Sequence, residues 1–274
     1  MASWPNLRRE GVILENEAVL ALDKPAGISV TGERHDTDLV RMAAEAGEEL
    51  FPAHRIDKVT SGVVLFARSL AVHGGLTRQF NRRTVSKAYL VITRSSGVPE
   101  RGTIDLPLTV GRKSRVRVAA PRQAIAWDGP AQRWSVPRSA VRDGARVYPS
   151  VTTFARLWEG GGHTVLLARP LTGRRHQIRV HLAWVGHPVD GDPLFDRSAE
   201  TRTFLHAWRL AFDASWADGH RVELEATPGA DFWAGAGRPS PARVAELLDR
   251  ARSLQAALDI DADEPGGPGL PSSG

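Results

Sequence analysis

Cysteine is absent from the 274 residues of this sequence. Its absence excludes disulfides, thiolate zinc sites and a cysteine nucleophile, and it is typical of a protein in a reducing compartment. A long apolar run is also missing: the first segment, MASWPNLRREGVILENEAV, has charges on both sides of a short apolar stretch. Such a segment is neither a signal peptide nor a membrane-spanning helix. We therefore expect a cytoplasmic protein that does not bind a membrane.

The sequence carries none of the short motifs that hold nucleotides or metals. No GxGxxG follows a predicted strand, and there is no GxxxxGK[ST] phosphate loop, HExxH pair or paired-carboxylate pattern. His176 and His181 are five residues apart, whereas two ligands on one helix face need a spacing of about three or four. We predict neither a metal site nor a cofactor.

Lysine is scarce, with four residues against 32 arginines, and the formal net charge is +5. The last 16 residues hold four acidic side chains and no Lys or Arg, so residues 1–258 carry +9. An excess of this size attracts polyanions, and nucleic acid is the first partner to consider. The alternative is that Arg is abundant through codon bias and lies at solvated surface positions.

The periodicity of the chain predicts mixed helix and strand at short spacing. Residues 19–30 are typical of a strand that enters a turn at Pro25 and Gly27. A helix with Thr37 or Asp38 as N-cap follows. Further along, a buried strand, a helix and an alternating strand are predicted at 63–67, 71–83 and 86–92.

The second half is regular only in part. Residues 95–160 are rich in Gly, Pro, Arg and Ser and predict loops or hairpins. The later elements are a strand at 163–170, a helix at 172–186 with Thr172 as N-cap and Gly186 as its end, strands at 203–212 and 221–227, and a helix at 240–258 that starts with Ser240 and Pro241. We predict one catalytic domain over 1–258 and a disordered acidic Pro/Gly tail over 259–274.

The stretch HRIDKVTSG, residues 54–62, contains the first candidate reactive group. Asp57, followed by Thr60, Ser61 and Gly62, is able to close an Asx-type turn, which is a structural role. Nearby cations at positions 55 and 58 instead favour an ionised carboxylate, the form that a nucleophile or a base needs. Both roles are open on these residues alone.

The predicted helix at 172–186 contains the second candidate. Helical spacing puts Arg175 and Arg179 one turn apart and His176 beside Arg179, with Ile178 and Leu182 facing the core. An Arg/His/Gln edge near a helix N-terminus is able to bind an anion, because free N–H groups and the helix dipole add to the side chains. A solvated charged face is the alternative.

Five blocks in the same order resemble the RluA-type pseudouridine synthases. HRIDKVTSG is similar to the HRLDxxTSG signature of that family, with Ile56 in place of leucine, and SKAYLVI is similar to its tyrosine strand. PLTGRRHQIRVHLAWVGHPVDGDPLF resembles its GRxHQIRxH and GHPxxGD motifs, DKPAGISV its KPAG turn and LHAWRLAF its LHAxxL strand. The match covers about residues 14–230, and the chain resembles the short members without an S4 domain.

The resemblance implies an enzyme that isomerises specific uridines to pseudouridine in rRNA or tRNA. The glycosidic N–C bond is cut, the uracil turns, and C5 rejoins the ribose, with no cofactor and no metal. Asp57 matches the essential aspartate, Tyr89 the tyrosine that packs on the uracil, and Arg179 the arginine that pairs with the catalytic carboxylate. Attack on the anomeric carbon, addition to the ring and passage through a glycal are all open.

The resemblance also implies residues that contact RNA. Arg55 matches the residue that fills the stack when the uridine is flipped out. Lys87 shares a strand face with Tyr89, and Ile178 contacts either the uracil or the core. The remaining candidates are His54, Arg174, Arg175 and His176, with a possible extension over Arg112, Lys113, Arg115 and Arg117.

The implied fold is α+β: a bent, largely antiparallel mixed sheet flanked by helices, with a cleft lined by the Asp57 loop, the Tyr89 strand and the Arg179 helix. We expect a monomer that acts on tRNA or large-subunit rRNA. Two rival hypotheses are an RNA-binding or ribosome-assembly factor with a decayed site, and a phosphoester hydrolase that uses Asp57 with His54 and His176.

Overall fold

The computed structural model describes residues 3–32, 38–142 and 146–263, with side chains as far as residue 258. Two compact units make up the chain, residues 1–89 with 201–229 and residues 90–200 with 230–274. The chain passes from the first to the second within strand β5 (Ser86–Thr93), with no linker at the boundary. A boundary inside a strand leaves no Pro- or Gly-rich signal in the sequence, and one catalytic domain over 1–258 stays a prediction.

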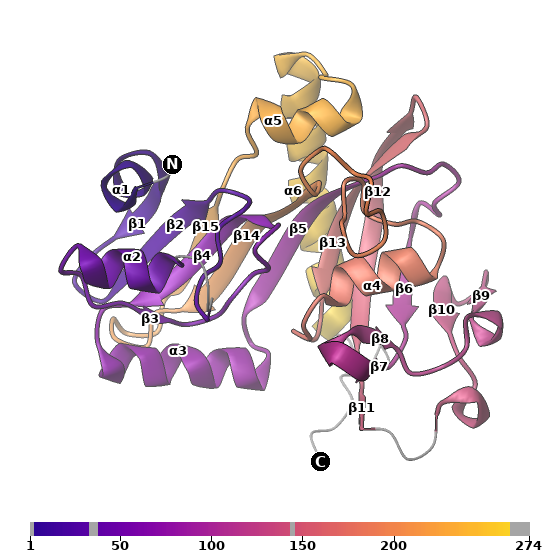
Figure 1. The fold of residues 1–274 in the computed structure, drawn as a ribbon, viewed down its shortest axis with the longest axis horizontal. Helices are drawn as coiled ribbons and strands as arrows, with labels where there is room; N and C mark the ends of the chain where they lie inside the picture. Colours follow the sequence, from indigo (N-terminus) through magenta and orange to yellow (C-terminus); the bar gives the residue numbers. More distant parts are fainter. Residues whose placement is uncertain (1–2, 33–37, 143–145, 264–274) are drawn as a thin grey trace. The chain divides into compact units, whose positions relative to one another are not determined.

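The first unit consists of a sheet between helices (Figure 1). Its strand order is β1-β2-β4-β14, with β3 beside β4 and β15 beside β14, and only the pairing of β14 with β4 is parallel among these. The strands are β1 (Val12–Glu15), β2 (Val19–Lys24), β3 (Phe51–Pro52), β4 (Ser61–Ala67), β14 (Leu205–Asp213) and β15 (Arg221–Glu225). The helices are α1 (Trp4–Gly11), α2 (Leu39–Glu45) and α3 (Leu70–Arg82).

Strand β4 is buried along its whole length because helices cover both faces of the sheet. Val64 and Phe66 pack in one core with α1 and α2, whereas Val63 and Leu65 pack in a second core with Leu76 of α3. Successive side chains of a strand point to opposite faces, so two covered faces require the continuous apolar run VVLFA. This burial fixes the loop that precedes β4, which carries Asp57.

The second unit has a sheet in the order β13-β12-β6-β10-β9 and a small sheet in the order β11-β7-β8. Its strands are β6 (Arg101–Asp105), β7 (Leu108–Val110), β8 (Val116–Val118), β9 (Ala126–Asp128), β10 (Arg133–Ser135), β11 (Val147–Tyr148), β12 (Val151–Gly160) and β13 (His163–Pro170). Its helices are α4 (Gln177–Trp184), α5 (Ala230–Trp233) and α6 (Pro241–Asp263), with 3₁₀ turns η1 (Arg112–Ser114), η2 (Arg122–Ala124), η3 (Arg138–Ala140) and η4 (Ala234–Ala236).

The predicted fold class is confirmed: the protein is α+β, with a largely antiparallel sheet flanked by helices. Asp38 is the N-cap of α2, since its carboxylate accepts from the Arg41 N–H at 3.0 Å. Ser240 caps α6 through the Arg243 N–H, as predicted. That helix runs to Asp263, five residues into the predicted tail, and residues 264–274 lie outside the described residues.

The predicted helix at 172–186 is wrong at its start. Helix α4 begins at Gln177, and its N-cap is His176 with a φ of 57°, so Thr172 is not the cap. Arg174 and Arg175 precede the helix, and the one-turn spacing of Arg175 and Arg179 on a helix face is therefore wrong as well. The side chain of Gln177 explains the late start, because it binds the preceding loop through the Thr172 hydroxyl at 2.6 Å and the Arg174 N–H at 3.1 Å. Gly186, with a φ of 98°, follows the end of the helix as expected.

Candidate active site

Asp57 lies in the loop between β3 and β4, where it is partly buried. Its carbonyl oxygen accepts from the Thr60 N–H at 3.0 Å and closes a tight turn. Gly62 follows in β4 with a φ of 108°, and a Cβ there would lie 2.2 Å from the carbonyl oxygen of Ala207 in β14. Glycine is therefore required at this position so that β4 and β14 pair closely.

Lys24 ties the turn at Pro25–Ile28 to the Asp57 loop. Its side chain is 1% exposed, and its Nζ donates to the carbonyl oxygens of Pro25 at 2.8 Å, Ile28 at 2.6 Å and Lys58 at 3.3 Å. Burial lowers the pKa of Lys24 to about 7, and the charge of Asp57 acts in the opposite direction. Three carbonyl acceptors match the three N–H bonds of an ammonium group, so these contacts favour the protonated form.

Tyr89 stands on β5 and packs against the core that contains Ile56. Burial raises the pKa of Tyr89 above its usual range, and the negative charge of Asp57 raises it further. The phenol therefore stays protonated at neutral pH and is available as a hydrogen-bond donor or an acid. The charge of Asp57 thus acts on both Tyr89 and Lys24, which brings the three groups into one electrostatic environment within the first unit.

A second group of polar side chains, linked by hydrogen bonds, lies at the start of β4. The Arg202 guanidinium donates to the Ser61 hydroxyl at 2.5 Å, and that hydroxyl lies 2.7 Å from Nδ1 of His206. The opposite ring nitrogen of His206 is 2.8 Å from the carbonyl oxygen of Ala226, which is able only to accept. His206 therefore carries its proton on Nε2, and the Ser61 hydroxyl donates to Nδ1. The charge of Arg202 also lowers the pKa of Lys24, so its guanidinium belongs to the same electrostatic environment.

The other predicted residues of the first unit differ in their surroundings. His54 accepts the Leu65 N–H at Nε2 (3.1 Å) and stacks on Phe80 with 4.8 Å between ring centroids. Burial lowers the pKa of His54 to about 3, with a further contribution from the charge of Lys87. These contacts favour a structural role for a neutral His54. Arg55, by contrast, is exposed and forms no hydrogen bond or ion pair with the residues that the structure describes.

Arg179 of the second unit is buried in helix α4 with Asp192 as its partner. The guanidinium donates from Nε at 2.8 Å and from Nη2 at 2.6 Å to the two oxygens of that carboxylate. Both side chains are nearly inaccessible to solvent, at 4% and 0% exposure. The pair is held by the Leu194 N–H, which also donates to Asp192 at 2.9 Å. This arrangement fixes the plane and position of the guanidinium.

The residues around Arg179 are also buried, so the solvated charged face considered for this helix is wrong. Ile178 is 6% exposed and lies in the core. His181 bridges Thr152 Oγ1 and the Leu106 carbonyl oxygen, both at 3.0 Å, and burial lowers its pKa to about 4. Gln177 donates to the Val151 carbonyl oxygen at 2.9 Å and to the Thr152 hydroxyl at 3.0 Å. The Gln and the second His of the GRxHQIRxH motif thus hold the helix in place.

The basic side chains before α4 contact other parts of the second unit. The Arg174 guanidinium lies 5.3 Å from the centroid of the Tyr148 ring, and the Arg175 guanidinium donates to the Ser114 carbonyl oxygen. His176 is partly exposed at the helix start. Among the described residues, no cluster of three or more His, Asp or Glu side chains is arranged to hold a metal ion, and no helix has the length and apolar composition to cross a membrane.

Sequence reasoning missed several polar residues that build this geometry: Lys24, Ser61, Asp192, Arg202 and His206. Four of them lie inside motifs already noted, namely KPAG, TSG, GD and LHA. A lysine before a Pro/Gly turn and an aspartate in a Gly-Asp pair are ordinary surface residues in most sequences. Only their burial in the structure distinguishes them.

Comparison with known proteins identifies the family. Residues 18–184 match the family described as RNA pseudouridylate synthase. The chain belongs to this family. It is 32% identical to tRNA pseudouridine synthase C of Pasteurella multocida, over 73% of this chain and 84% of that protein. It is 34% identical to the human pseudouridylate synthase RPUSD2, over 69% of this chain but only 31% of that longer protein.

A solved structure agrees on the fold. Human RNA Pseudouridylate Synthase Domain Containing 4 has a TM-score of 0.64 at 23% identity, and the match covers 91% of this chain and 95% of that one. The family predicted from the sequence motifs is confirmed by the family match and by the curated relatives. The relatives' names include both tRNA and ribosomal large subunit enzymes.

Proposed function

We propose that this protein isomerises uridine to pseudouridine in structured RNA, with Asp57 as the reacting carboxylate. The observation that carries the proposal is the position of Asp57, at a turn fixed by buried β4 and by Lys24, with its charge acting on Tyr89. A carboxylate in a fixed turn, whose charge acts on a protonated phenol, suits covalent or proton-transfer chemistry on a uracil ring.

Tyr89 and Arg179 have different parts in the proposed reaction. Tyr89 supplies a protonated phenol for the uracil face and for proton transfer at C5. Arg179, oriented by Asp192, supplies a fixed positive charge for the carboxylate chemistry of the family, and its pairing with Asp57 stays a prediction. Arg55, which is exposed and unpaired among the described residues, remains the candidate to fill the stack left by a flipped uridine.

The proposed partner is RNA, and the proposal leaves open which class of RNA the protein modifies. The relatives' names cover tRNA, ribosomal large subunit and dual-specificity enzymes, so both RNA classes are candidates. RNA contacts by Lys87, Arg174, Arg175 and His176, a monomeric state, the absence of a metal and cofactor, and a cytoplasmic location stay predictions. The hydrolase hypothesis loses support, since His54 is engaged with the backbone of β4.

Tritium release from uracil C5 tests the proposal. Labelled tRNA and rRNA transcripts are incubated with wild type and with Asp57→Asn, because the new C–C bond expels the hydrogen at C5. We expect release from at least one RNA class by wild type and none by the variant. If neither transcripts nor native cellular RNA release tritium while both proteins bind RNA equally, the binding-factor hypothesis replaces the synthase.

A further inference from the structure

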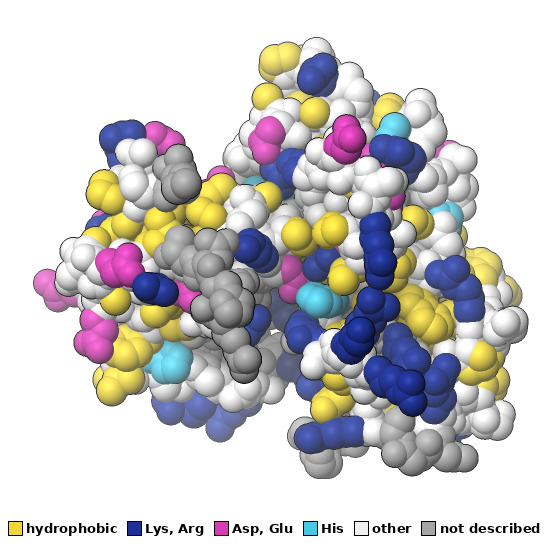
Figure 2. Space-filling view, in the orientation of Figure 1, with side chains coloured by type: hydrophobic (Ala, Val, Ile, Leu, Met, Phe, Trp, Pro, Cys, Tyr) yellow, Lys and Arg dark blue, Asp and Glu magenta, His cyan; other side chains and the backbone are white. Residues whose placement is uncertain are grey.

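The segment from residue 106 to 148 in the second unit is strongly basic. It contains nine Lys and Arg residues and only two acidic residues, Asp128 and Asp143. Figure 2 shows Lys and Arg side chains gathered over α4 and the small sheet of this unit. Such a surface attracts polyanions.

Several arginines elsewhere on the surface have carboxylate partners. In α6, Arg243 pairs with Glu246 at 2.7 Å and Arg252 with Asp249 at 2.6 Å. In the first unit, Arg41 pairs with Glu45 at 2.9 Å. Within the described ranges, no ion pair is formed by the exposed cations of the β7–β8 hairpin: Arg112, Lys113, Arg115 and Arg117. Their charge is therefore available to an outside anion.

The hairpin has a fixed shape. Strands β7 and β8 pair in antiparallel register, and the Gly111 N–H donates to the Arg115 carbonyl oxygen at 2.7 Å. Lys113 and Ser114 both adopt a positive φ, at 54° and 57°, which is uncommon for residues other than glycine. Backbone strain of this kind persists where surrounding structure enforces it, and it gathers at functional sites.

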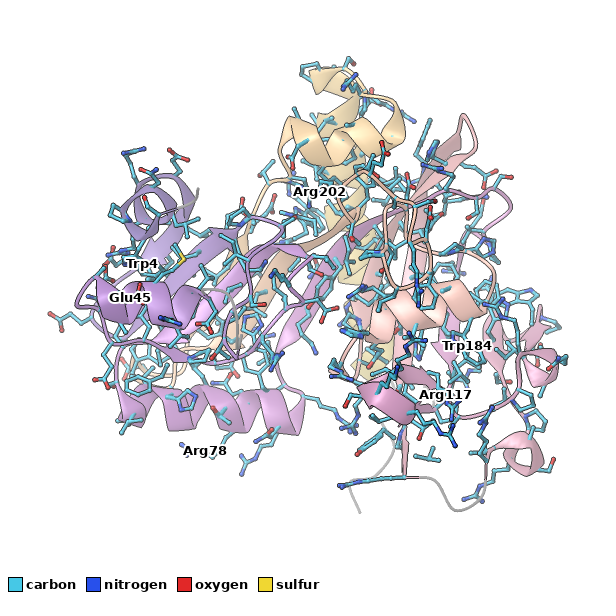
Figure 3. All side chains as sticks on the ribbon, viewed as in Figure 1. Trp4, Glu45, Arg78, Arg117, Trp184 and Arg202 are labelled. Carbon is cyan, nitrogen blue, oxygen red and sulfur yellow. The ribbon has the colours of Figure 1, made fainter. Side chains whose placement is uncertain are left out.

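The turn is tied to the loop before α4. The Arg175 guanidinium donates to the Ser114 carbonyl oxygen, and β8 packs against α4. Figure 3 labels Arg117 on this hairpin and Trp184 at the end of α4. The Nε of Arg117 lies 3.1 Å from the position that a Cβ on Gly111 would occupy, so Gly111 leaves room for the guanidinium.

A further pair of guanidiniums lies on one aromatic ring beside the hairpin. Arg146 and Arg174 are each 5.3 Å from the ring centroid of Tyr148, which belongs to β11 of the same small sheet. Cation–π contacts hold arginine side chains in place without neutralising their charge. Arg146 and Arg174 are thus held on the same ring, and neither forms an ion pair with a carboxylate of the described residues.

We propose that the β7–β8 hairpin, with its cations Arg112, Lys113, Arg115 and Arg117, is an arm that binds RNA phosphates outside the target nucleotide. Exposed cations on a hairpin of fixed backbone shape, with no carboxylate partner among the described residues, fit a phosphate backbone, which carries no sequence information. The inference rests on the proposed function for the identity of the polyanion.

The test compares two triple variants of equal charge change. Arg112→Gln/Lys113→Gln/Arg115→Gln removes three of the four hairpin cations, and Arg243→Gln/Arg250→Gln/Arg252→Gln removes three exposed cations of α6. The dissociation constant of a fluorescent tRNA transcript is measured between about 50 and 200 mM salt. Each lost phosphate contact reduces the magnitude of the slope of log K (K being the association constant) against log salt concentration by about 0.7 to 0.9. We therefore expect the slope of the hairpin variant to be smaller in magnitude than that of wild type by about 2 to 3.

Affinity at 0.15 M salt should fall by about 10-fold or more for the hairpin variant, and the α6 variant should bind as wild type does. Arg112→Lys/Arg115→Lys, which keeps the charge, should retain the wild-type slope. Equal slopes for the hairpin and α6 variants, with thermal unfolding showing both folded, would overturn the proposal. Failure of the proposed function has a separate signature: wild type would release no tritium from any RNA, whatever the slopes.

Discussion

The Arg179 guanidinium and the Asp192 carboxylate form a bidentate ion pair, at 2.6 and 2.8 Å, that is almost fully buried in the second unit. One partner comes from the GRxHQIRxH motif and the other from the GHPxxGD motif, 13 residues later. The short segment through Gly186, which joins the two motifs, therefore brings the Asp192 carboxylate to the guanidinium of Arg179. A buried cation needs such a partner, since an isolated charge is expensive to remove from water.

Replacement of Asp192 separates the stability of this pair from its function. Asp192→Ala leaves an uncompensated buried cation and should lower the free energy of unfolding by about 3–5 kcal/mol. Asp192→Asn keeps the shape but not the charge, and we expect a loss of kcat on the order of 10²-fold, with KM less affected. Chemical denaturation and tritium-release kinetics measure the two effects.

A double variant provides the control. Arg179→Met/Asp192→Leu replaces both charges with apolar side chains, so stability should recover most of what the single change loses. Activity should stay low, because the guanidinium is gone. Recovery of activity together with stability would show that the pair is only structural.

The lowered pKa of Lys24 predicts that the stability of the folded protein depends on pH. Its pKa is lowered to about 7 by burial, so above that pH the folded protein releases a proton that the unfolded chain keeps until about 10.5. Between about pH 7 and 10.5 the unfolded state binds more protons than the folded state does. The contribution of Lys24 to the free energy of unfolding therefore rises with pH over this range. Denaturation at pH 7 and pH 9.5 should show this rise in wild type.

Lys24→Met should abolish the rise that Lys24 causes and should also lower activity, because the turn at Pro25–Ile28 and the Asp57 loop lose their common donor. Lys113→Met is the matched control for the pH dependence of stability, since Lys113 is exposed on the hairpin. A pH dependence that is the same in wild type and Lys24→Met would contradict the assignment.

Tyr89→Phe removes the hydroxyl of Tyr89 and keeps its aromatic ring, so it tests the role of the hydroxyl. Because burial and the charge of Asp57 both raise the pKa of Tyr89, its hydroxyl stays protonated over the pH range of an assay. Loss of a proton donor in the transition state should lower kcat by about 10²- to 10⁴-fold, with little change in RNA affinity. Single-turnover kinetics provide the measurement, and a kcat within about threefold of wild type would leave Tyr89 with a packing role alone.

Local sequence patterns predicted several elements well where one interaction dominates. The Asp38 and Ser240 caps, the buried run VVLFA and the strand at 163–170 follow from side chains that act on their own backbone or from a continuous apolar pattern. Even the small hairpins of residues 95–160 were expected in kind, although their bounds were not.

The start of α4 could not be predicted, because it depends on contacts far along the chain. Gln177 binds Val151 and Thr152 of β12, more than 20 residues earlier in the sequence, and these bonds hold the preceding loop out of the helix. Local propensity instead favoured Thr172 as a cap. Tertiary hydrogen bonds override the propensity of a few residues when they are buried.

The sequence motifs name the candidate reactive residues, whose roles stay predictions, but they do not name the residues that support them. Asp57, Tyr89 and Arg179 stand in distinctive motifs. The support given by Lys24 and Asp192, and by the chain from Arg202 through Ser61 to His206, depends on which polar groups are buried together. Sequence spacing carries no information on that point, since the partners come from separate elements.

His181 makes the protein sensitive to acid. Burial lowers its pKa to about 4, and its neutral ring donates to the Leu106 carbonyl oxygen while the Thr152 hydroxyl donates to Nδ1. Between about pH 6.5 and 4 the unfolded chain therefore binds a proton that the folded protein does not, and stability falls as the pH falls, by about 1 kcal/mol per pH unit. His181→Gln should remove this part of the slope in urea titrations at pH 4.5, 5.5 and 6.5, whereas His220→Gln, at an exposed position, should keep it. A wild-type slope in His181→Gln would mean that other groups cause the acid sensitivity.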